Sequence, residues 1–251
     1  MQQTKVIFDP IKHQYFVDDI NYPSVTQIIG VLDKSAPLIN WSLRIAMDYL
    51  SRNFDTLKNS INSENAGKIF YEAKKEYMKI KDEAADIGTQ IHDIIHRINN
   101  NESVDLTKYD ERVQNGVNAY LKWANSVNYS PIKSEFIIYS KKFKFAGTCD
   151  GLGFINGKLA ILDWKSSNAI YDEYKLQIAA YDAALKEMGT EQPVEDHYII
   201  RFSKDTGDFE VCKVEDIAKH FEAFKAAIQL YAWKKSMQKN GRSCVEKSLI
   251  K

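Results

Sequence analysis

Apolar positions along the chain repeat with two different periods, which divide the sequence into a helical part and a β-rich part. Over residues 84–98, apolar side chains recur every three or four positions, which is typical of a helix with one buried face. Residues 135–165 instead contain three β-rich runs separated by turn residues. Three more helices and two more strands are expected, over 111–126, 174–188 and 215–237 and over 194–202 and 208–214. This order predicts a mixed α/β (α+β) fold, with a central mixed β-sheet flanked by helices.

The N-terminal half is expected to hold a short hairpin followed by a helical region. Two β-rich runs lie within residues 6–17. Ser24 followed by Gln27 is the pattern of a helix capping box. Polar residues 59–66 predict a loop before a helix rich in Lys and Glu, which continues or restarts through residue 99.

Composition narrows the class of protein. The chain has 251 residues with 34 basic and 34 acidic side chains, so its formal charge is zero and binding of nucleic acid over its whole surface is disfavoured. It has no run of roughly 18 apolar residues and no apolar leader. The three cysteines lie far apart, without a Cys-x-x-Cys spacing. We expect a soluble cytoplasmic protein with one domain over 1–251, in which residues 1–130 form the hairpin and helical region and residues 131–251 form the sheet and C-terminal helix.

The most informative segment for chemistry covers residues 147–165. Asn156-Gly157 between two β-rich runs is a strong signal for a two-residue hairpin turn. Such a turn sets the register of the two strands so that Asp150 faces Asp163, unless a bulge intervenes. Directly opposed side chains share one face of a sheet, so these two carboxylates repel each other unless a cation lies between them.

Lys165 adds an amine to this pair of acids. It lies two positions beyond Asp163 and therefore on the same face of the strand. Two carboxylates grouped in this way suit Mg²⁺ or Mn²⁺, which prefer oxygen ligands. The simpler alternative is a cross-strand Asp–Lys salt bridge at a solvated sheet edge, which leaves the second Asp unexplained. We therefore favour the metal site.

Two predicted helices carry polar side chains that could join this site. His92 borders the apolar face of the helix over 84–98. Gln177 and Tyr181 are neighbours one turn apart on the helix over 174–188. Each of these residues, taken alone, is more typical of an ordinary helix border than of a ligand.

The order and rough spacing of these residues resemble the motif series of the RecB-like nucleases in the PD-(D/E)XK superfamily. The matching motifs are His92, Gly147-x-x-Asp150, Asp163-x-Lys165 and Gln177-x-x-x-Tyr181. Pro23-Ser24-Val25-Thr26 also resembles the start of the mitochondrial genome maintenance exonuclease branch and its phage relatives. The resemblance covers roughly residues 23–185 and implies a restriction-endonuclease-like core. It also implies a metal-dependent deoxyribonuclease, and specifically an exonuclease that prefers single-stranded DNA or free DNA ends.

The resemblance further implies a role for each residue. The ligands of one or two Mg²⁺ or Mn²⁺ ions would be His92, Asp150, Asp163 and the backbone carbonyl of Trp164. Lys165 would orient the attacking water, and Gln177 and Tyr181 would hold the DNA backbone or the water network. Glu135 stands where such proteins often carry a Glu that opens the strand before the first Asp. The iron–sulfur members of this superfamily use four cysteines, so no cluster is expected here.

DNA is the expected partner, although the contacts with it are less well defined. Ser166 and Ser167 could donate hydrogen bonds to a phosphate, and Lys141 and Lys142 could line a phosphate track. Aromatic residues among the lysines of segment 64–86 are the mixture that stacks on single-stranded bases. In the resembled exonucleases, N-terminal helices form an arch through which a strand threads, so an arch that binds DNA is expected within residues 1–130.

The same residues suggest three alternatives to an exonuclease. The same core could belong to a structure-specific or restriction-type endonuclease, or to a DNA-binding protein without catalytic activity. The presence of both aspartates and the lysine argues against a protein without catalytic activity. A zinc peptidase helix built on His92 and His96 is rejected, because Asp93 replaces the Glu that must follow the first His and no third ligand is evident.

Overall fold

The computed structural model describes residues 4–59 and 63–240, and the chain forms two compact units. The first unit combines Met1–Leu32 with Ile91–Lys251, and the second is Asp33–Gln90. The long helix α4 (Ser63–Asn99) contributes to both units. None of the described helices is long and apolar enough to cross a membrane.

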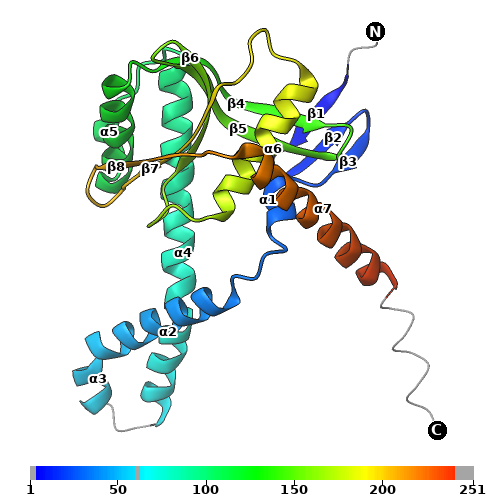
Figure 1. Cartoon of the computed structure of the whole chain (residues 1–251). Coiled ribbons are helices and arrows are strands. Elements are labelled where there is room, and N and C mark those ends of the chain that lie inside the picture. Colours follow the sequence, from blue (N-terminus) through cyan, green and yellow to red (C-terminus); the bar gives the residue numbers. More distant parts are fainter. Residues whose placement is uncertain (1–3, 60–62, 241–251) are drawn as a thin grey trace, which may run out of the picture. The chain divides into compact units, whose positions relative to one another are not determined.

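A five-stranded sheet forms the centre of the first unit (Figure 1). The strands follow one another in sequence order across the sheet: β4 (Ser130–Ser140), β5 (Phe145–Ile155), β6 (Lys158–Lys165), β7 (Asp196–Phe202) and β8 (Phe209–Lys213). Strands β6 and β7 are parallel, and every other neighbouring pair is antiparallel. A parallel pair needs a crossover, which α6 (Glu173–Met188) provides. The predicted mixed sheet flanked by helices is confirmed.

The turn between β5 and β6 has the conformation that its sequence predicts. Asn156 and Gly157 both have positive φ angles, 50° and 81°, as a two-residue hairpin turn of this type requires. Ile155 pairs with Lys158, and the register continues without a shift to Gly151 and Leu162. The predicted register is therefore confirmed up to the step before Asp150 and Asp163.

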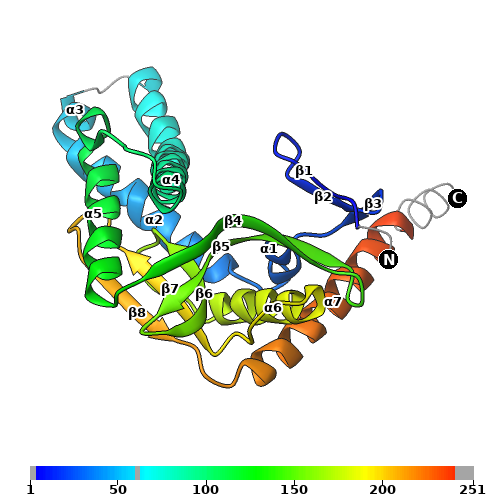
Figure 2. The ribbon, with the colours of Figure 1, turned by 90° about the horizontal axis from the view of Figure 1, so that it is seen from above.

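One face of the sheet is covered by α6 and α7 (Ile217–Asn240), as Figure 2 shows. The short helix α1 (Val25–Ile29) joins this layer, and its buried Ile28 belongs to the same apolar core. The predicted capping box is confirmed, since Ser24 Oγ accepts the backbone N–H of Gln27 and the Gln27 side chain accepts the N–H of Ser24.

The opposite face carries α5 (Glu111–Ser126) and the end of α4, joined by the short 3₁₀ helix η1 (Leu106–Lys108). Trp123 of α5 and Trp164 of β6 are fully buried here, with ring centroids 5.3 Å apart. Gly116 allows α5 to approach α4 closely, because a Cβ atom at this position would lie only 2.4 Å from Cδ1 of Ile91. This contact positions the end of α4, which carries His92, against α5.

A second, three-stranded sheet stands beside β4 and β5. It consists of β1 (Val6–Asp9), β2 (Gln14–Val17) and β3 (Ile20–Tyr22), all antiparallel. Its buried side chains form a small core with Ala146 of β5. In Figure 2 the hairpin projects from the side of β4 and β5 opposite α6.

The second unit is entirely helical. It contains α2 (Ser35–Arg52), α3 (Phe54–Asn59) and the part of α4 up to Gln90. The Trp41 and Tyr77 rings, which belong to α2 and α4, meet edge to face with centroids 6.1 Å apart. The loop predicted over 59–66 is too long. Helix α4 already begins at Ser63, so the polar residues 63–66 belong to a helix. Residues 60–62 lie outside the described residues.

Candidate metal and catalytic site

The site begins where the β5–β6 ladder ends. Beyond the Gly151–Leu162 pair, Asp150 no longer continues the ladder, and its Oδ2 accepts the backbone N–H of Trp164 at 2.7 Å. The Asp150 carboxylate is thus held directly beside the residue that follows Asp163. Burial raises the pKa of Asp150, and the charges of His92 and Lys165 offset part of this rise.

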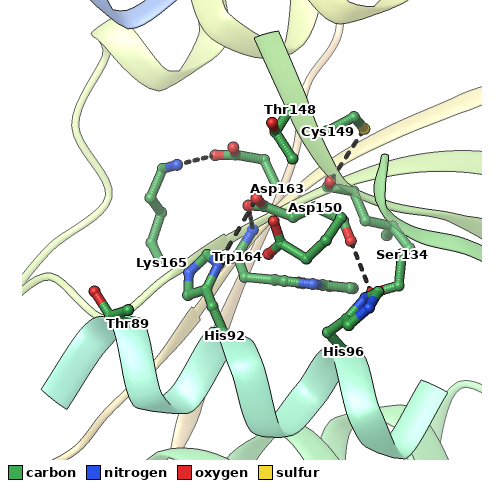
Figure 3. Close-up of polar contacts among 12 residues, drawn as sticks. Thr89, His92, His96, Ser134, Thr148, Cys149, Asp150, Asp163, Trp164 and Lys165 are labelled. Atoms are coloured by element: carbon green, nitrogen blue, oxygen red, sulfur yellow. Dashed lines mark hydrogen bonds and ion pairs between the residues drawn. The ribbon is translucent and has the colours of Figure 1, made fainter. Parts of the chain in front are cut away.

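Asp163 is a completely buried carboxylate with one cation beside it. Its Oδ2 lies 2.6 Å from Nζ of Lys165, which places both side chains on one face of β6 as predicted (Figure 3). Burial raises the pKa of Asp163 to about 7, and the charge of Asp150 adds to this rise while Lys165 opposes it. Burial by itself lowers the pKa of Lys165, but the two carboxylates outweigh it, so that Lys165 stays charged.

His92 and Glu135 complete the acidic cluster from two other elements. Nδ1 of His92, near the end of α4, lies 3.2 Å from Oε1 of Glu135 and 3.7 Å from Oδ1 of Asp150. Ligand atoms of all three side chains lie within 4.8 Å of one another. Burial works to lower the pKa of His92, but the charges of Asp150 and Glu135 outweigh it and raise the pKa.

The backbone of Glu135 is unusual for a strand residue. Its φ of 49° lies in the left-handed region, which residues other than glycine rarely adopt. Strained conformations of this kind cluster at functional sites, because surrounding contacts must hold them in place. Here the strain accompanies a side chain that contacts His92.

A line of polar groups leads from Lys165 into α6. Nζ of Lys165 donates to Oε1 of Gln177 at 3.2 Å, and Nε2 of Gln177 donates to the hydroxyl of Tyr181 at 2.6 Å. Both α6 side chains are buried, and burial raises the pKa of Tyr181 well above its ordinary range. The i, i+4 pair predicted from sequence is therefore in contact with the cluster.

The structure places the other predicted site residues elsewhere. Ser166 and Ser167 follow β6 directly, and the hydroxyl of Ser167 donates to the carbonyl of Ala169 at 2.8 Å. Lys141 and Lys142 occupy the turn between β4 and β5, before the first residue of β5, whereas Asp150 lies in the middle of that strand.

The two lysines already have partners at that turn. Nζ of Lys141 lies 2.6 Å from Oδ2 of Asp18, and the backbone N–H groups of Lys141 and Lys142 donate to Glu187. Neither lysine is part of the carboxylate cluster.

Two aromatic residues near the site were not predicted. The ring of Tyr174 lies 4.7 Å from Nζ of Lys165, and the hydroxyl of Tyr15 is 2.9 Å from Oγ1 of Thr148. Tyr174 could have been found from its i, i+3 relation to Gln177 on the same helix. Tyr15 carries no such signal, because the sequence separates it widely from the strand that it contacts.

The donor set fits a hard divalent cation. Oδ1 of Asp163 is buried and accepts no hydrogen bond from any described residue, which is costly for a carboxylate oxygen. His92, Glu135 and Asp150 supply imidazole and oxygen ligands of the kind that Mg²⁺ and Mn²⁺ accept. Asp163 is not a member of this group, but it lies close enough for the charge of Asp150 to raise its pKa. A bound cation would satisfy the free oxygen and offset the repulsion between the carboxylates.

No family model matches the chain, and no curated protein matches it. Among solved structures, a candidate exonuclease from Eubacterium rectale aligns at 15% identity over 52% of this chain and 54% of its own, with a TM-score of 0.38. The alkaline exonuclease LHK-Exo from Laribacter hongkongensis aligns at 11% identity over 67% of this chain and 86% of its own, with a TM-score of 0.33.

The same exonuclease in complex with dAMP aligns with a TM-score of 0.35 at 12% identity. The alignment spans only about half the length of the Eubacterium rectale protein. All of these TM-scores are below 0.5, so these similarities support no conclusion about function.

Proposed function

We propose that this protein is a metal-dependent nuclease that hydrolyses DNA phosphodiester bonds, with a preference for single strands or free DNA ends. The observation that carries the proposal is the buried Asp163 carboxylate, which has a cationic partner on one oxygen and, among the described residues, none on the other. The resemblance to the RecB-like branch of the PD-(D/E)XK superfamily agrees with this chemistry. The runner-up is an endonuclease on the same core.

The cation would be held by His92 and Asp150, which form with Glu135 a group of ligand atoms within 4.8 Å of one another, and Asp163 is proposed to add a further carboxylate from beside that group. A divalent ion in such a site lowers the pKa of a water molecule and polarises a phosphoryl oxygen. Mg²⁺ and Mn²⁺ are the ions that this ligand set suits. The backbone carbonyl of Trp164 is proposed as a further ligand.

Lys165 would act on the reacting groups directly. Its ammonium group is buried, charged and held by Asp163 and Gln177, so it can donate a hydrogen bond to an attacking water or to a phosphate oxygen. A fixed positive charge in a site shielded from bulk water stabilises the negative charge that builds up on the phosphate. Gln177 and Tyr181 keep the ammonium group in place, and Ser166 and Ser167 are proposed to bind a neighbouring phosphate.

The second unit is proposed to contact single-stranded DNA as an arch. Phe70 and Tyr71 are more than half exposed, and Nζ of Lys75 lies 4.2 Å from the centre of the Tyr71 ring. Exposed aromatic rings beside cations are what base stacking requires. Loss of single-strand binding in Phe70→Ala and Tyr71→Ala variants would support this assignment.

The decisive experiment incubates end-labelled linear DNA and circular single-stranded DNA with the protein, in Mn²⁺ or in EDTA. We expect digestion of linear DNA that requires Mn²⁺ and that Asp163→Asn abolishes, while circles remain intact. Cleavage of circles would favour the endonuclease. DNA binding by the wild-type protein without any cleavage would identify a silent DNA-binding protein and refute the proposal.

A further inference from the structure

The tip of the β1–β2 hairpin exposes an apolar side chain that the proposed chemistry does not use. Ile11 is 94% exposed, whereas the next most exposed large apolar side chains in the described part of the chain reach 63%. Isolated apolar residues are common on protein surfaces. This one differs in the rigidity of the turn that holds it and in the direction in which that turn points.

Hydrogen bonds and ring contacts fix the tip. Oδ1 of Asp9 accepts the backbone N–H groups of Ile11 and Lys12, both at 3.0 Å. The ring of Phe8 stacks on Tyr15 with centroids 4.6 Å apart and meets His13 edge to face at 5.3 Å. A tip built in this way presents Ile11 in one position and loses little conformational freedom when it binds a ligand.

Two contacts show that the hairpin points toward the carboxylate cluster. Asp18 lies at the end of β2 away from the tip, and it pairs with Lys141, which directly follows the last residue of β4. Tyr15, nearer the tip, contacts Thr148, which is two residues before Asp150. The direction from Asp18 through Tyr15 to the tip of the hairpin is therefore the direction in which β5 runs toward Asp150.

The same contacts limit the distance between the tip and the cluster. Strand residues advance by about 3.3 Å each, so the backbone of Ile11 lies at most about 13 Å from that of Tyr15, and the backbone of Asp150 lies about 7 Å from that of Thr148. The charges of Glu135 and Asp150 reach Tyr15 and add to the effect of burial in raising its pKa. The exposed tip thus stands within a few nucleotide lengths of the proposed cleavage centre.

We propose that this tip is a wedge for duplex DNA, in which Ile11 inserts at the terminal base pair and separates the strand that enters the metal site. This inference rests on the proposed nuclease function and specifies its substrate. Aliphatic side chains inserted at a base step unstack the bases, whereas the stacking surfaces of single-strand binders are aromatic rings. Lys12 and His13 beside Ile11 are exposed and suit the adjoining phosphates.

The test uses a blunt duplex with 2-aminopurine in its terminal base pair, and it measures fluorescence with protein in excess and EDTA present. We expect a several-fold rise with the wild-type protein and with Ile11→Met, because the fluorescent base leaves the stack. Ile11→Ser should leave the signal near that of the free duplex. Ile20→Ser is the matched control, because Ile20 is an isoleucine of the same small sheet that is also exposed, at 59%.

Equal signals from the wild-type protein and Ile11→Ser, or no rise with the wild-type protein, would overturn the wedge. Cleavage gives a second measurement: Ile11→Ser should lower the rate on blunt duplex relative to single strands by about tenfold or more, since unstacking a base step costs a few kcal/mol. A wild-type protein that cuts no DNA would refute the proposed nuclease function. The fluorescence measurement needs no cleavage, so it would still show whether Ile11 separates the terminal base pair.

Discussion

Metal affinity should depend steeply on pH, because the proposed ligand Asp163 holds a proton near neutrality. Its pKa in the metal-free protein is raised to about 7 by burial. A carboxylate must lose its proton before it can bind a cation. At pH 5 only about one molecule in a hundred has Asp163 ionised, so the affinity for Mn²⁺ should be about 100-fold weaker than at pH 8, or about 2.7 kcal/mol.

The direction of this effect follows from the sign of the shift. The folded-state pKa of Asp163 lies above its ordinary value of 3.8, so protons compete with the ion below pH 7 and no longer do so above it. The raised pKa of His92 works in the same direction, since an imidazole ligand must also be neutral. Affinity should therefore rise with pH and level off above about pH 8.

Isothermal titration of the metal-free protein with Mn²⁺ checks this prediction. Titrations in two buffers with different ionisation enthalpies count the protons released, and we expect about one from Asp163 at pH 6 and none above pH 9. Asp163→Asn should bind Mn²⁺ weakly and keep only the pH dependence of the remaining ligands. Equal Mn²⁺ affinities of the wild-type protein at pH 5 and pH 8 would refute the reasoning.

Three further predictions concern single side chains. Lys165→Ala should lower the cleavage rate at least about 100-fold, and circular dichroism should check that the variant, with Asp163 unpaired, still folds. His92→Ala should weaken Mn²⁺ binding, measured by titration, at least about tenfold, with the melting temperature of the metal-free protein little changed. Gly116→Ala should destabilise the fold by about 1–3 kcal/mol in urea unfolding, and Ile91→Val, which removes the Cδ1 atom 2.4 Å away, should restore part of that loss. Additive losses in the double variant would contradict the predicted contact.

Much of the fold could be predicted because local signals in the sequence agree with one another. The Asn156-Gly157 turn sets the register of β5 and β6, and alternation along β6 places Lys165 beside Asp163. These inferences depend only on neighbours in the sequence. They succeed because the two-residue turn leaves little choice of pairing.

The remaining features depend on contacts that no local pattern encodes. The resemblance places Glu135 near the metal site at the opening of its strand, but no local pattern shows that it contacts His92 from a left-handed backbone conformation. Asp150 binds the Trp164 N–H where the ladder ends, and a sequence does not show where a ladder stops. The boundary between the two units falls inside α4, a helix whose sequence shows no break at that point.

Burial links the stability of the fold to the chemistry proposed for the site. Ile161, two residues before Asp163 on the same face of β6, and Ile199, its partner on β7, are buried apolar residues, so the sheet removes water from this carboxylate. A buried charge without a partner is strongly destabilising, and Lys165 supplies one partner only. The remaining oxygen can gain either a proton or a metal ion, and the raised pKa shows that the proton is held until near neutral pH. The desolvation that makes Asp163 costly in the metal-free protein is therefore what would make binding of a divalent cation favourable once that proton has left.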